Sequence, residues 1–564
     1  MNSKVMDLDL SEIVFSRALS RFLVFEQKEG DDRGLFLSLT YDAPGSLREA
    51  GLVKIEPWRD GAPVPYEYTA DPGKLEIRTQ YGNILMAIQE PSVLRVRAQG
   101  VSLRLFAKMR MHEGAVDRLN GCCEVSFASI GKILYVPIKG SITFNAKWLL
   151  NDMRPDDAEA ICAPDGDGVL ELAVHEYIAN ELPRQSYPSV EDCAREAMED
   201  YEAWFKKYGA FSEKCLPTAR LAAYTIWVCR QQPHKGNPHS VMKNEMVFRT
   251  RTGYGRAYAM DQLLQSMAIT DDLETSLYFL KNILPYRLES GQLPNWINDV
   301  YGNYDISRAP TFGAVTEVFI KNYGIEALTN EQWEEIFWEF LKCASWWMNN
   351  RVSGEIKLMY HFREECGFRG ATIFSGGCPV CAPDLMSFMA IFADTLGRIA
   401  NHINIDEAES WWEYAENVID SMLCDLWHDT GYASRGAGGL VESGSILNFV
   451  PLILGGRVPQ ETQQCLIDAL KWDPLRSNDD GFLFERGRQG IVFNAEQMVI
   501  LGMLANGEGE DFLKRIVNSI LREGIYDTLP RIKTAPGAMW SSESAASTLL
   551  LLKAYDVRCE REED

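Results

Sequence analysis

The chain has 564 residues, and its 56 basic and 80 acidic side chains give a formal net charge of −24. A hydrophobic share of 46% with 24% charged residues is typical of globular proteins and excludes a disordered or fibrous chain. The acidic balance repels a phosphate backbone, so we predict neither nucleic acid nor an anionic membrane as a partner.

The start of the chain, MNSKVMDLDLSEIV, has acids where a secretory signal needs a basic region and a long apolar run. No stretch approaches the roughly 20 apolar residues of a membrane-spanning helix. These two observations predict a cytoplasmic protein.

The 13 cysteines are odd in number and scattered, which favours free thiols. Cys378 and Cys381 have CxxC spacing, and together with His361 and Cys366 they offer zinc four soft ligands as an alternative. Because no second CxxC pair exists, we predict no metal, and we predict no cofactor.

The first part of the chain has the pattern of short β-strands. Leu94 and Val96, then Leu103 and Leu105, alternate with polar residues on both sides of Gly100, which predicts a β-hairpin with one buried face. Similar short runs are separated by Gly, Pro and Asp. Regularly spaced short strands predict an N-terminal β-sandwich domain over residues 1–188.

The hydrophobic period then becomes helical. Residues 189–209 begin with Ser189, carry acids in the first turns and end with Lys206, Lys207 and Gly209. This pattern predicts that residues 189–215 form a linker helix. About a dozen helix-length segments fill residues 216–564. Consecutive helix pairs predict an (α/α)6 barrel as the catalytic domain, with an open solenoid as the alternative. The predicted fold is therefore mainly α with an N-terminal all-β domain.

The loops between these helices have an unusual composition. GQLPNWINDVYGNYD (291–305) and LWHDTGYASRGAGG (426–439) combine acids, Arg, aromatic rings and Gly. Aromatic rings stack on the C–H faces of sugars, acids and Arg bind hydroxyl groups, and Gly lets the backbone approach a ligand. We therefore predict a small carbohydrate substrate at the end of the barrel where the loops meet.

Five segments, in chain order, resemble motifs of one enzyme group. One of them, SRAPTFGAV (307–315), looks like a segment with paired prolines. GRAYAMDQLL (255–264) resembles an aromatic-Asp helix start, and GQLPNWIND (291–299) a Gly-Gln-(Ile/Leu)-Pro-Asn stretch. CAPDLMSF (381–388) is similar to a Val-Asp-Leu-Asn helix, and FERGRQGIVF (484–493) to a Trp-Arg-Gly-Pro-(Ile/Val)-Trp element. Over about residues 216–556 the chain thus resembles the six-hairpin inverting glycosidases, the group of the trehalases, the processing α-glucosidases and mannosylglycerate hydrolase.

The resemblance implies roles for individual residues. Asp261 matches a pocket-lining acid of the group, and Arg486 matches an arginine that holds substrate hydroxyls. Where the group has Glu-Ser-Gly-Trp-Asp ending in the general acid, this chain has residues 365–369, ending in Arg369. A guanidinium with a pKa above about 12 cannot protonate a leaving oxygen. Three alternatives remain: the acid is Glu365 or its neighbour Glu364, the acid is Asp261, or the site does not hydrolyse.

In this enzyme group, the general base precedes a Phe-Gly-Trp-Thr turn. At the corresponding place this chain has Asp527, and Glu543, which follows Trp540, is a second candidate. Inversion needs two carboxyl groups about 6.5–9.5 Å apart. N-capping is an alternative role for Asp384, and packing is one for Trp296 and Trp540. Our substrate-binding candidates are Tyr254, Gln262, Asn295, Trp296, Arg308, Arg369, Asp384, Arg486 and Trp540.

We therefore predict an intracellular glycosidase that cleaves a small oligosaccharide or glycoside with inversion. Glu365 or Asp261 is the predicted acid, and Asp527 or Glu543 the predicted base. One alternative is a lyase or isomerase that uses Arg369 to hold a carboxylate or stabilise a developing negative charge. Another is a catalytically inactive sugar-binding protein.

Overall fold

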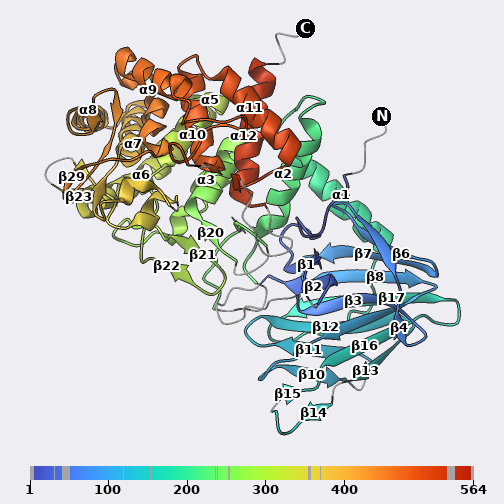
Figure 1. Cartoon of the computed structure of the whole chain (residues 1–564). Helices are drawn as coiled ribbons and strands as arrows, with labels where there is room; N and C mark the ends of the chain where they lie inside the picture. Colours follow the sequence, from blue (N-terminus) through green and yellow to red (C-terminus); the bar gives the residue numbers. More distant parts are fainter. Residues whose placement is uncertain are drawn as a thin grey trace.

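The structure is a computed structural model that describes residues 6–30, 32–40, 51–118, 120–145, 147–152, 154–234, 237, 239–251, 255–353, 357–368, 370–488, 490–529 and 540–559. Antiparallel sheets occupy the described chain up to Tyr177, and helices dominate it from Val190 onward (Figure 1). The expected sequence of an all-β part followed by a helical part is therefore confirmed.

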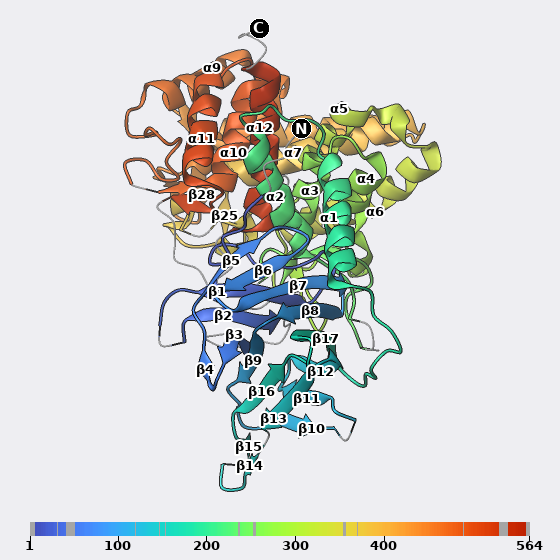
Figure 2. The same ribbon diagram turned by 90° about the vertical axis from the view of Figure 1, so that its right-hand side faces the viewer.

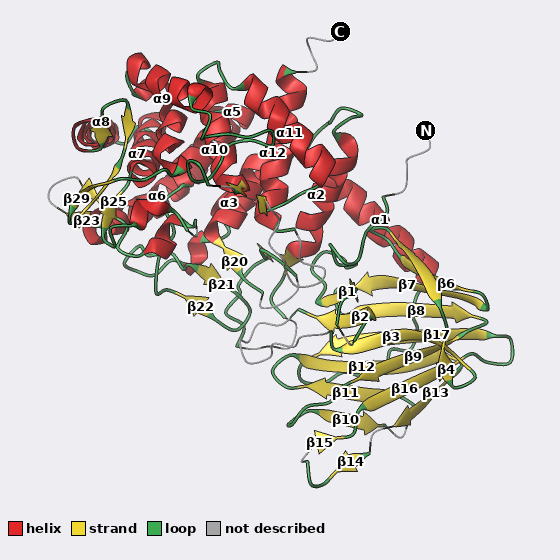
Figure 3. Ribbon diagram, in the orientation of Figure 1, coloured by secondary structure: helices red, strands yellow, loops and turns green. Residues whose placement is uncertain are grey.

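Two large antiparallel sheets form the N-terminal part (Figure 3). The first sheet has the order β1 (Phe22–Gln27), β2 (Gly34–Leu39), β3 (Val53–Arg59), β9 (Ser102–Ala107), β16 (Ala158–Ala163) and β13 (Ser141–Asn145), with β4 (Ala62–Pro63) beside β3. The second has the order β10 (Gly114–Asp117), β11 (Cys123–Phe127), β12 (Gly131–Lys139), β17 (Val169–Tyr177), β8 (Val93–Gln99), β7 (Gly82–Glu90), β6 (Leu75–Thr79) and β5 (Tyr66–Ala70).

The predicted hairpin around Gly100 is wrong, although both of its segments are strands. β8 pairs with β7 and β17, whereas β9 pairs with β3 and β16, so the chain crosses from one sheet to the other at Gly100. Leu94, Val96, Leu103 and Leu105 are all buried. The alternation correctly indicated one buried face for each strand, but that pattern does not choose the partner strand.

Helix α1 (Val190–Lys206) follows the sheets directly and packs on β7 and β8 (Figure 2). Ser189 caps it, because its side chain accepts a hydrogen bond from the backbone N–H of Asp192 at 3.0 Å. Val190 and Cys193 are buried against Ala87 of β7. The helix predicted from the sequence therefore exists and contacts the second sheet.

Six elements of the helical part form a closed series of contacts. α3 contacts α5, α5 contacts α7, α7 contacts η6, η6 contacts α10, α10 contacts α12, and α12 contacts α3. Their bounds are α3 (Ala259–Ala268), α5 (Phe312–Tyr323), α7 (Pro383–His402), η6 (Ile446–Arg457), α10 (Phe493–Ala505) and α12 (Ser542–Arg558). Other helices contact members of this ring, namely α2 (Leu216–Cys229), α4 (Leu273–Lys281), α6 (Asn330–Asn350), α8 (Ala408–Asp425), α9 (Gln460–Trp472) and α11 (Glu510–Glu523).

One member of this ring is not an α-helix. η6 is a 3₁₀ helix with Pro451 inside it and a break in helical geometry at Gly455. Proline removes a backbone donor, so a regular α-helix cannot run through this segment.

The remaining elements are short, with β14 and β15 in the N-terminal part and the others in the helical part. The short strands are β14 (Trp148–Leu149), β15 (Arg154–Pro155), β18 (Arg230–Gln231), β19 (Met246–Val247), β20 (Ala257–Tyr258), β21 (Trp296–Ile297), β22 (Gly302–Asn303), β23 (Val352–Ser353), β24 (Lys357–Leu358), β25 (Val380–Cys381), β26 (Trp427–His428), β27 (Gly431–Tyr432), β28 (Ser434–Gly436), β29 (Gly439–Val441), β30 (Ile491–Val492) and β31 (Thr528–Leu529). The short 3₁₀ turns are η2 (Leu284–Tyr286), η3 (Ile325–Ala327), η4 (Arg363–Cys366) and η5 (Thr372–Phe374). None of the helices in the described part of the chain has the length and apolar character needed to cross a lipid bilayer.

Candidate active site

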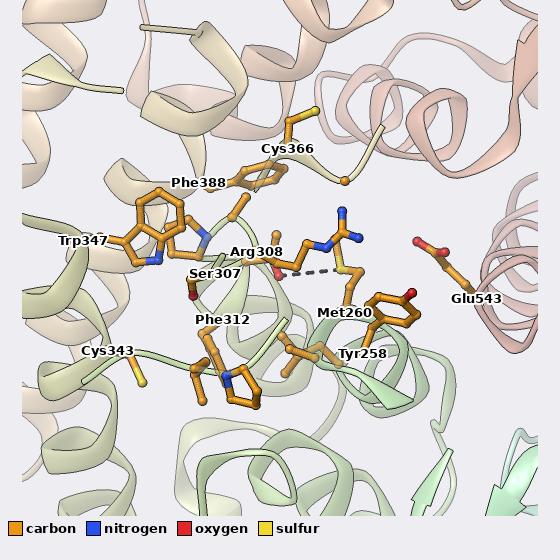
Figure 4. Close-up of a pocket in the computed structure, with 18 of the residues that line it drawn as sticks. Tyr258, Met260, Ser307, Arg308, Phe312, Cys343, Trp347, Cys366, Phe388 and Glu543 are labelled. Carbon is orange, nitrogen blue, oxygen red and sulfur yellow. Dashed lines mark hydrogen bonds between the residues drawn. The ribbon is translucent and has the colours of Figure 1, made fainter. Parts of the chain in front are cut away.

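A cavity lies within the helical part, beside the N-terminal ends of α3, α5 and α12 (Figure 4). Its lining has two characters. Apolar side chains form one region, including Leu263, Leu293, Phe312, Trp347, Phe388 and Met498. Polar side chains from four separate segments form the other, namely Arg249, Tyr258, Ser307, Arg308 and Glu543.

Local structure explains how the polar side chains meet. Strand β20 pairs with β21, which places Tyr258 directly before α3. Ser541 caps α12 by accepting a hydrogen bond from Ser544 at 3.1 Å, so Glu543 lies in the first helical turn. The backbone N–H of Ser542 donates to the carbonyl of Arg249 at 2.8 Å, which joins the start of α12 to the loop that carries Arg249.

Arg249 contacts two carboxylates through one nitrogen. Its Nη2 donates to Oδ1 of Asp261 at 2.8 Å and lies 2.5 Å from Oε2 of Glu543. Its guanidinium also lies over the ring of Tyr258, 4.3 Å from the ring centroid. Arg249 therefore fixes Asp261, Glu543 and Tyr258 relative to one another.

Glu543 is the only carboxylate that lines the cavity among the described residues. Its side chain is 13% exposed. Burial raises the pKa of Glu543 to about 7, with Asp261 and Asp527 acting in the same direction and Arg249 and Arg308 opposing it. The carboxyl group thus exchanges a proton near neutral pH, as a general base or acid must.

Arg308 faces Glu543 from the other side of the cavity (Figure 4). Its Nε donates to Oδ1 of Asn295 at 2.8 Å, and its Nη1 donates to the carbonyl of Glu364 at 2.7 Å. Within the described residues, Arg308 has no ion pair. Burial and the nearby charge of Arg249 lower its pKa.

Two predicted carboxylates lie next to Glu543 without lining the cavity. Asp261 is fully buried in the first turn of α3, behind Arg249, and burial raises its pKa. Asp527 is exposed, and its Oδ1 accepts hydrogen bonds from the hydroxyls of Ser541 at 2.7 Å and Ser544 at 2.5 Å. The structure thus brings Asp261, Asp527 and Glu543 together around the start of α12.

Glu365 is held in a different environment. It is fully buried, and its Oε1 lies 2.7 Å from Nη2 of Arg351. Its Oε2 accepts from the backbone N–H groups of His361 at 2.8 Å and Phe362 at 3.2 Å. All of these contacts fix the turn η4, so the carboxylate faces Arg351 while its neighbour Cys366 lines the cavity.

Several predicted binding residues have structural contacts instead of cavity positions. Gln262 is fully buried and bonds both backbone groups of Val247. Trp296 packs against Tyr301, with ring centroids 5.4 Å apart. Asp384 accepts a hydrogen bond from the hydroxyl of Tyr360 at 2.8 Å, and its other oxygen has no partner among the described residues.

The remaining candidates divide into exposed, buried and undescribed positions. Arg486 is exposed and paired with Asp473, with Nε 2.5 Å from Oδ2. Trp540 is buried one residue before the cap of α12 and does not line the cavity. Tyr254 and Arg369 lie outside the described residues.

The zinc alternative finds no support in the described residues, where no three His, Cys, Asp or Glu side chains form a group that could hold a metal ion. Cys366 and Cys381 are buried, and Cys378 is exposed.

Sequence reasoning missed three residues of the polar region, Arg249, Tyr258 and Ser307. Arg249 precedes the α3 motif by several residues and has no acidic neighbour in sequence, so nothing local marks it as a partner of Asp261. Tyr258 lies inside the quoted motif, and its position at the aromatic-Asp helix start was the available signal.

The sequence matches no family profile and no curated protein. Among solved structures, a family GH92 α-mannosidase from Bacteroides thetaiotaomicron, in complex with mannoimidazole, matches with a TM-score of 0.57 and 10% identity, over 97% of this chain and 82% of that chain. A GH63 mannosylglycerate hydrolase from Thermus thermophilus, in complex with glucose, matches with a TM-score of 0.46 and 14% identity, over 55% of this chain and 95% of that chain.

The α-mannosidase match covers nearly the whole chain, so the order of sheets and helices is that of a known glycosidase structure. At 10% identity this likeness concerns the fold.

Proposed function

We propose that this chain is a glycoside hydrolase whose active site is the cavity beside Glu543. The observation that carries the proposal is a single buried carboxyl group with a pKa of about 7, facing a guanidinium across a cavity. A carboxyl group that titrates near neutral pH is suited to take a proton from water. The mixed polar and apolar lining suits a sugar ring, which has polar edges and C–H faces.

In this proposal the architecture is a β-sandwich over residues 1–188, a linker over 189–215 and an (α/α)6 barrel over 216–564. The cyclic contacts from α3 through α12 and back support a closed barrel over an open solenoid, since the ends of a solenoid do not meet. The cytoplasmic location expected from the sequence stays a prediction.

Glu543 acts as the general base that activates water for attack on the anomeric carbon. Asp261 does not act as the acid across the sugar from Glu543, because both carboxylates contact the same nitrogen of Arg249. An inverting pair needs about 6.5–9.5 Å between the two groups. Asp261 instead positions Arg249, which in turn orients Glu543.

The proposal assigns the substrate hydroxyl groups to the polar region of the cavity. Arg308 and Tyr258 are the groups available to contact a ligand there, and Asn295 orients Arg308. The substrate is a small glycoside, because the cavity is partly enclosed by helices and short loops.

A panel of 4-nitrophenyl glycosides of the common hexoses, in both anomeric forms, tests the proposal. The released 4-nitrophenolate is detected by absorbance, and ¹H NMR identifies the first anomer formed. We expect at least one glycoside to be cleaved with inversion, and cleavage to fall about 1,000-fold in Glu543→Gln. Cleavage that survives in Glu543→Gln would contradict the assignment.

A further inference from the structure

The two arginines of the polar region differ in their contacts with carboxylates. Arg249 is neutralised by Asp261 and also contacts Glu543, whereas Arg308 makes no ion pair with any described residue. A partly buried cation that no carboxylate contacts is stabilised when an anion binds directly beside it. Two hydrogen bonds to neutral oxygens hold Arg308 in place. They leave its Nη2 without a hydrogen-bond partner in the part of the chain that the structure describes.

Within the part of the chain that the structure describes, the same region has no second acid. Among the described residues, Glu543 is the carboxylate that lines the cavity, and the group opposite it is the guanidinium of Arg308 (Figure 4). A guanidinium cannot donate its proton to a leaving oxygen, but it binds phosphate oxygens well. The arrangement fits a leaving group that departs as an anion and needs no protonation by the enzyme.

Resting on the proposed function, we propose that the substrate is a glycosyl phosphate, whose phosphate group Arg308 binds and stabilises as it departs. Glu543 takes one proton from water, and the water oxygen bonds to the anomeric carbon. The bond between that carbon and the phosphate oxygen breaks, with its electron pair going to the phosphate. From the monoanionic ester the products are the inverted free sugar, hydrogen phosphate dianion and protonated Glu543.

Leaving-group chemistry favours this step. Below its second pKa of about 6 a phosphate monoester is a monoanion. From that form phosphate departs as hydrogen phosphate, which is a stable anion near neutral pH. An alcohol resembles water, with a pKa of about 15.7, and departs only with a proton. A site with one base and one arginine can therefore release phosphate, but it releases a sugar alcohol poorly.

The net charge of −24 on the whole chain does not prevent a phosphate group from binding in the cavity. Interactions between exposed charges are screened over about 8–10 Å at physiological salt. Arg249 and Arg308 both lie near the ring of Tyr258, with their guanidinium carbons 4.3 Å and 5.3 Å from its centroid.

The test compares three substrates of the sugar that the 4-nitrophenyl panel identifies: its 4-nitrophenyl glycoside, its 1-phosphate and its methyl glycoside. We expect kcat/KM for the 1-phosphate to exceed that for the methyl glycoside by about 100-fold or more. Arg308→Gln should lower kcat/KM for the 1-phosphate about 100-fold and that for the 4-nitrophenyl glycoside about tenfold or less. Arg363→Gln is the matched control, because it removes an exposed arginine paired with Glu364 in the neighbouring turn.

Binding of inorganic phosphate provides a second measurement that does not depend on turnover. Isothermal titration should show phosphate binding to the wild-type chain, at least tenfold weaker binding to Arg308→Gln, and wild-type binding to Arg363→Gln. Circular dichroism shows whether Arg308→Gln is folded, and Arg308→Lys, which keeps the charge, should retain part of the phosphate affinity.

The outcomes separate the two proposals. Cleavage of the methyl glycoside as fast as the 1-phosphate, or an equal loss on both test substrates in Arg308→Gln, overturns the phosphate assignment and leaves the glycosidase proposal standing. Phosphate titration without binding to the wild-type chain also overturns it. A panel without any cleaved 4-nitrophenyl glycoside rejects the glycosidase proposal, and the phosphate assignment is rejected with it.

Discussion

Nη2 of Arg249 lies 2.5 Å from Oε2 of Glu543, so the carboxylate with a pKa of about 7 is in direct contact with an arginine. Burial exceeds the effect of this contact, because the pKa stays above the ordinary value of 4.5 despite the neighbouring positive charge. The pH range of catalysis in our proposal therefore depends on both residues.

Replacing Arg249 should shift the pH range in which the enzyme is active. Arg249 lowers the pKa of Glu543, so Arg249→Gln should raise it further, by roughly one unit or more. If ionised Glu543 is the base, the acid limb of the pH profile of kcat/KM moves to higher pH. Profiles of wild type and Arg249→Gln on the same 4-nitrophenyl glycoside measure this shift. An unchanged acid limb, in a variant that retains activity, would show that Arg249 does not control Glu543.

Glu365 and its neighbour Glu364 form a matched pair for a stability test. Glu365 is buried with Arg351, whereas Glu364 is exposed and paired with exposed Arg363. Breaking a buried ion pair leaves an uncompensated charge, so Glu365→Gln should destabilise the fold by about 3 kcal/mol or more. Glu364→Gln should change stability by less than about 1 kcal/mol. Thermal unfolding of both variants checks this, and equal Tm values would refute the structural role of Glu365.

Asp384 should make stability depend on pH. Burial raises its pKa to about 6, above the 3.8 of a free side chain, so the folded state binds the proton more tightly. Its contribution to stability is then complete below about pH 4 and is lost as the pH rises through 6, by about 3 kcal/mol in total.

Asp384→Asn removes this titration and keeps an oxygen for the hydroxyl of Tyr360. The Tm of the variant, relative to wild type, should therefore be higher at pH 8 than at pH 4.5. The control is Asp429→Asn, at an exposed position. The difference in Tm between this variant and wild type should be the same at both pH values. A Tm difference for Asp384→Asn that is independent of pH would contradict a raised pKa at this position.

Arg486 should contribute little to substrate binding. Its guanidinium is exposed and paired with Asp473, away from the residues that line the cavity. An exposed ion pair contributes little energy, so Arg486→Gln should keep KM within about twofold of wild type. A large rise in KM without a change in Tm would contradict this prediction and support the substrate-binding role that the sequence motif implied for Arg486.

The features of the fold that local chemistry determines were predictable. Ser189 caps α1 as expected, and Pro383 occupies the first position of α7, where proline suits a helix start. The partner of strand β8 was not predictable, because any strand with a buried face satisfies the same alternation. Strand pairing depends on contacts between distant segments, which a single sequence does not reveal.

In the candidate site, too, some residues could be predicted from the sequence and others could not. The motif after Trp540 pointed to Glu543, and the aromatic-Asp motif pointed to Asp261. Sequence could not show that Arg249 joins them, nor that Glu365 pairs with Arg351 while Cys366 lines the cavity. Adjacent residues in a turn face different directions, and only the path of the backbone decides which side chain reaches the cavity.

The pH dependence of kcat/KM for a cleaved 4-nitrophenyl glycoside, measured for wild type and Glu543→Gln, tests the central claim most directly. We predict that wild-type activity falls below about pH 7, where Glu543 becomes protonated and can no longer accept a proton from water. In Glu543→Gln we predict a loss of about 1,000-fold and a flat profile across this range. A wild-type profile without a break near pH 7, or a variant that keeps both the rate and the break, would contradict Glu543 as the base.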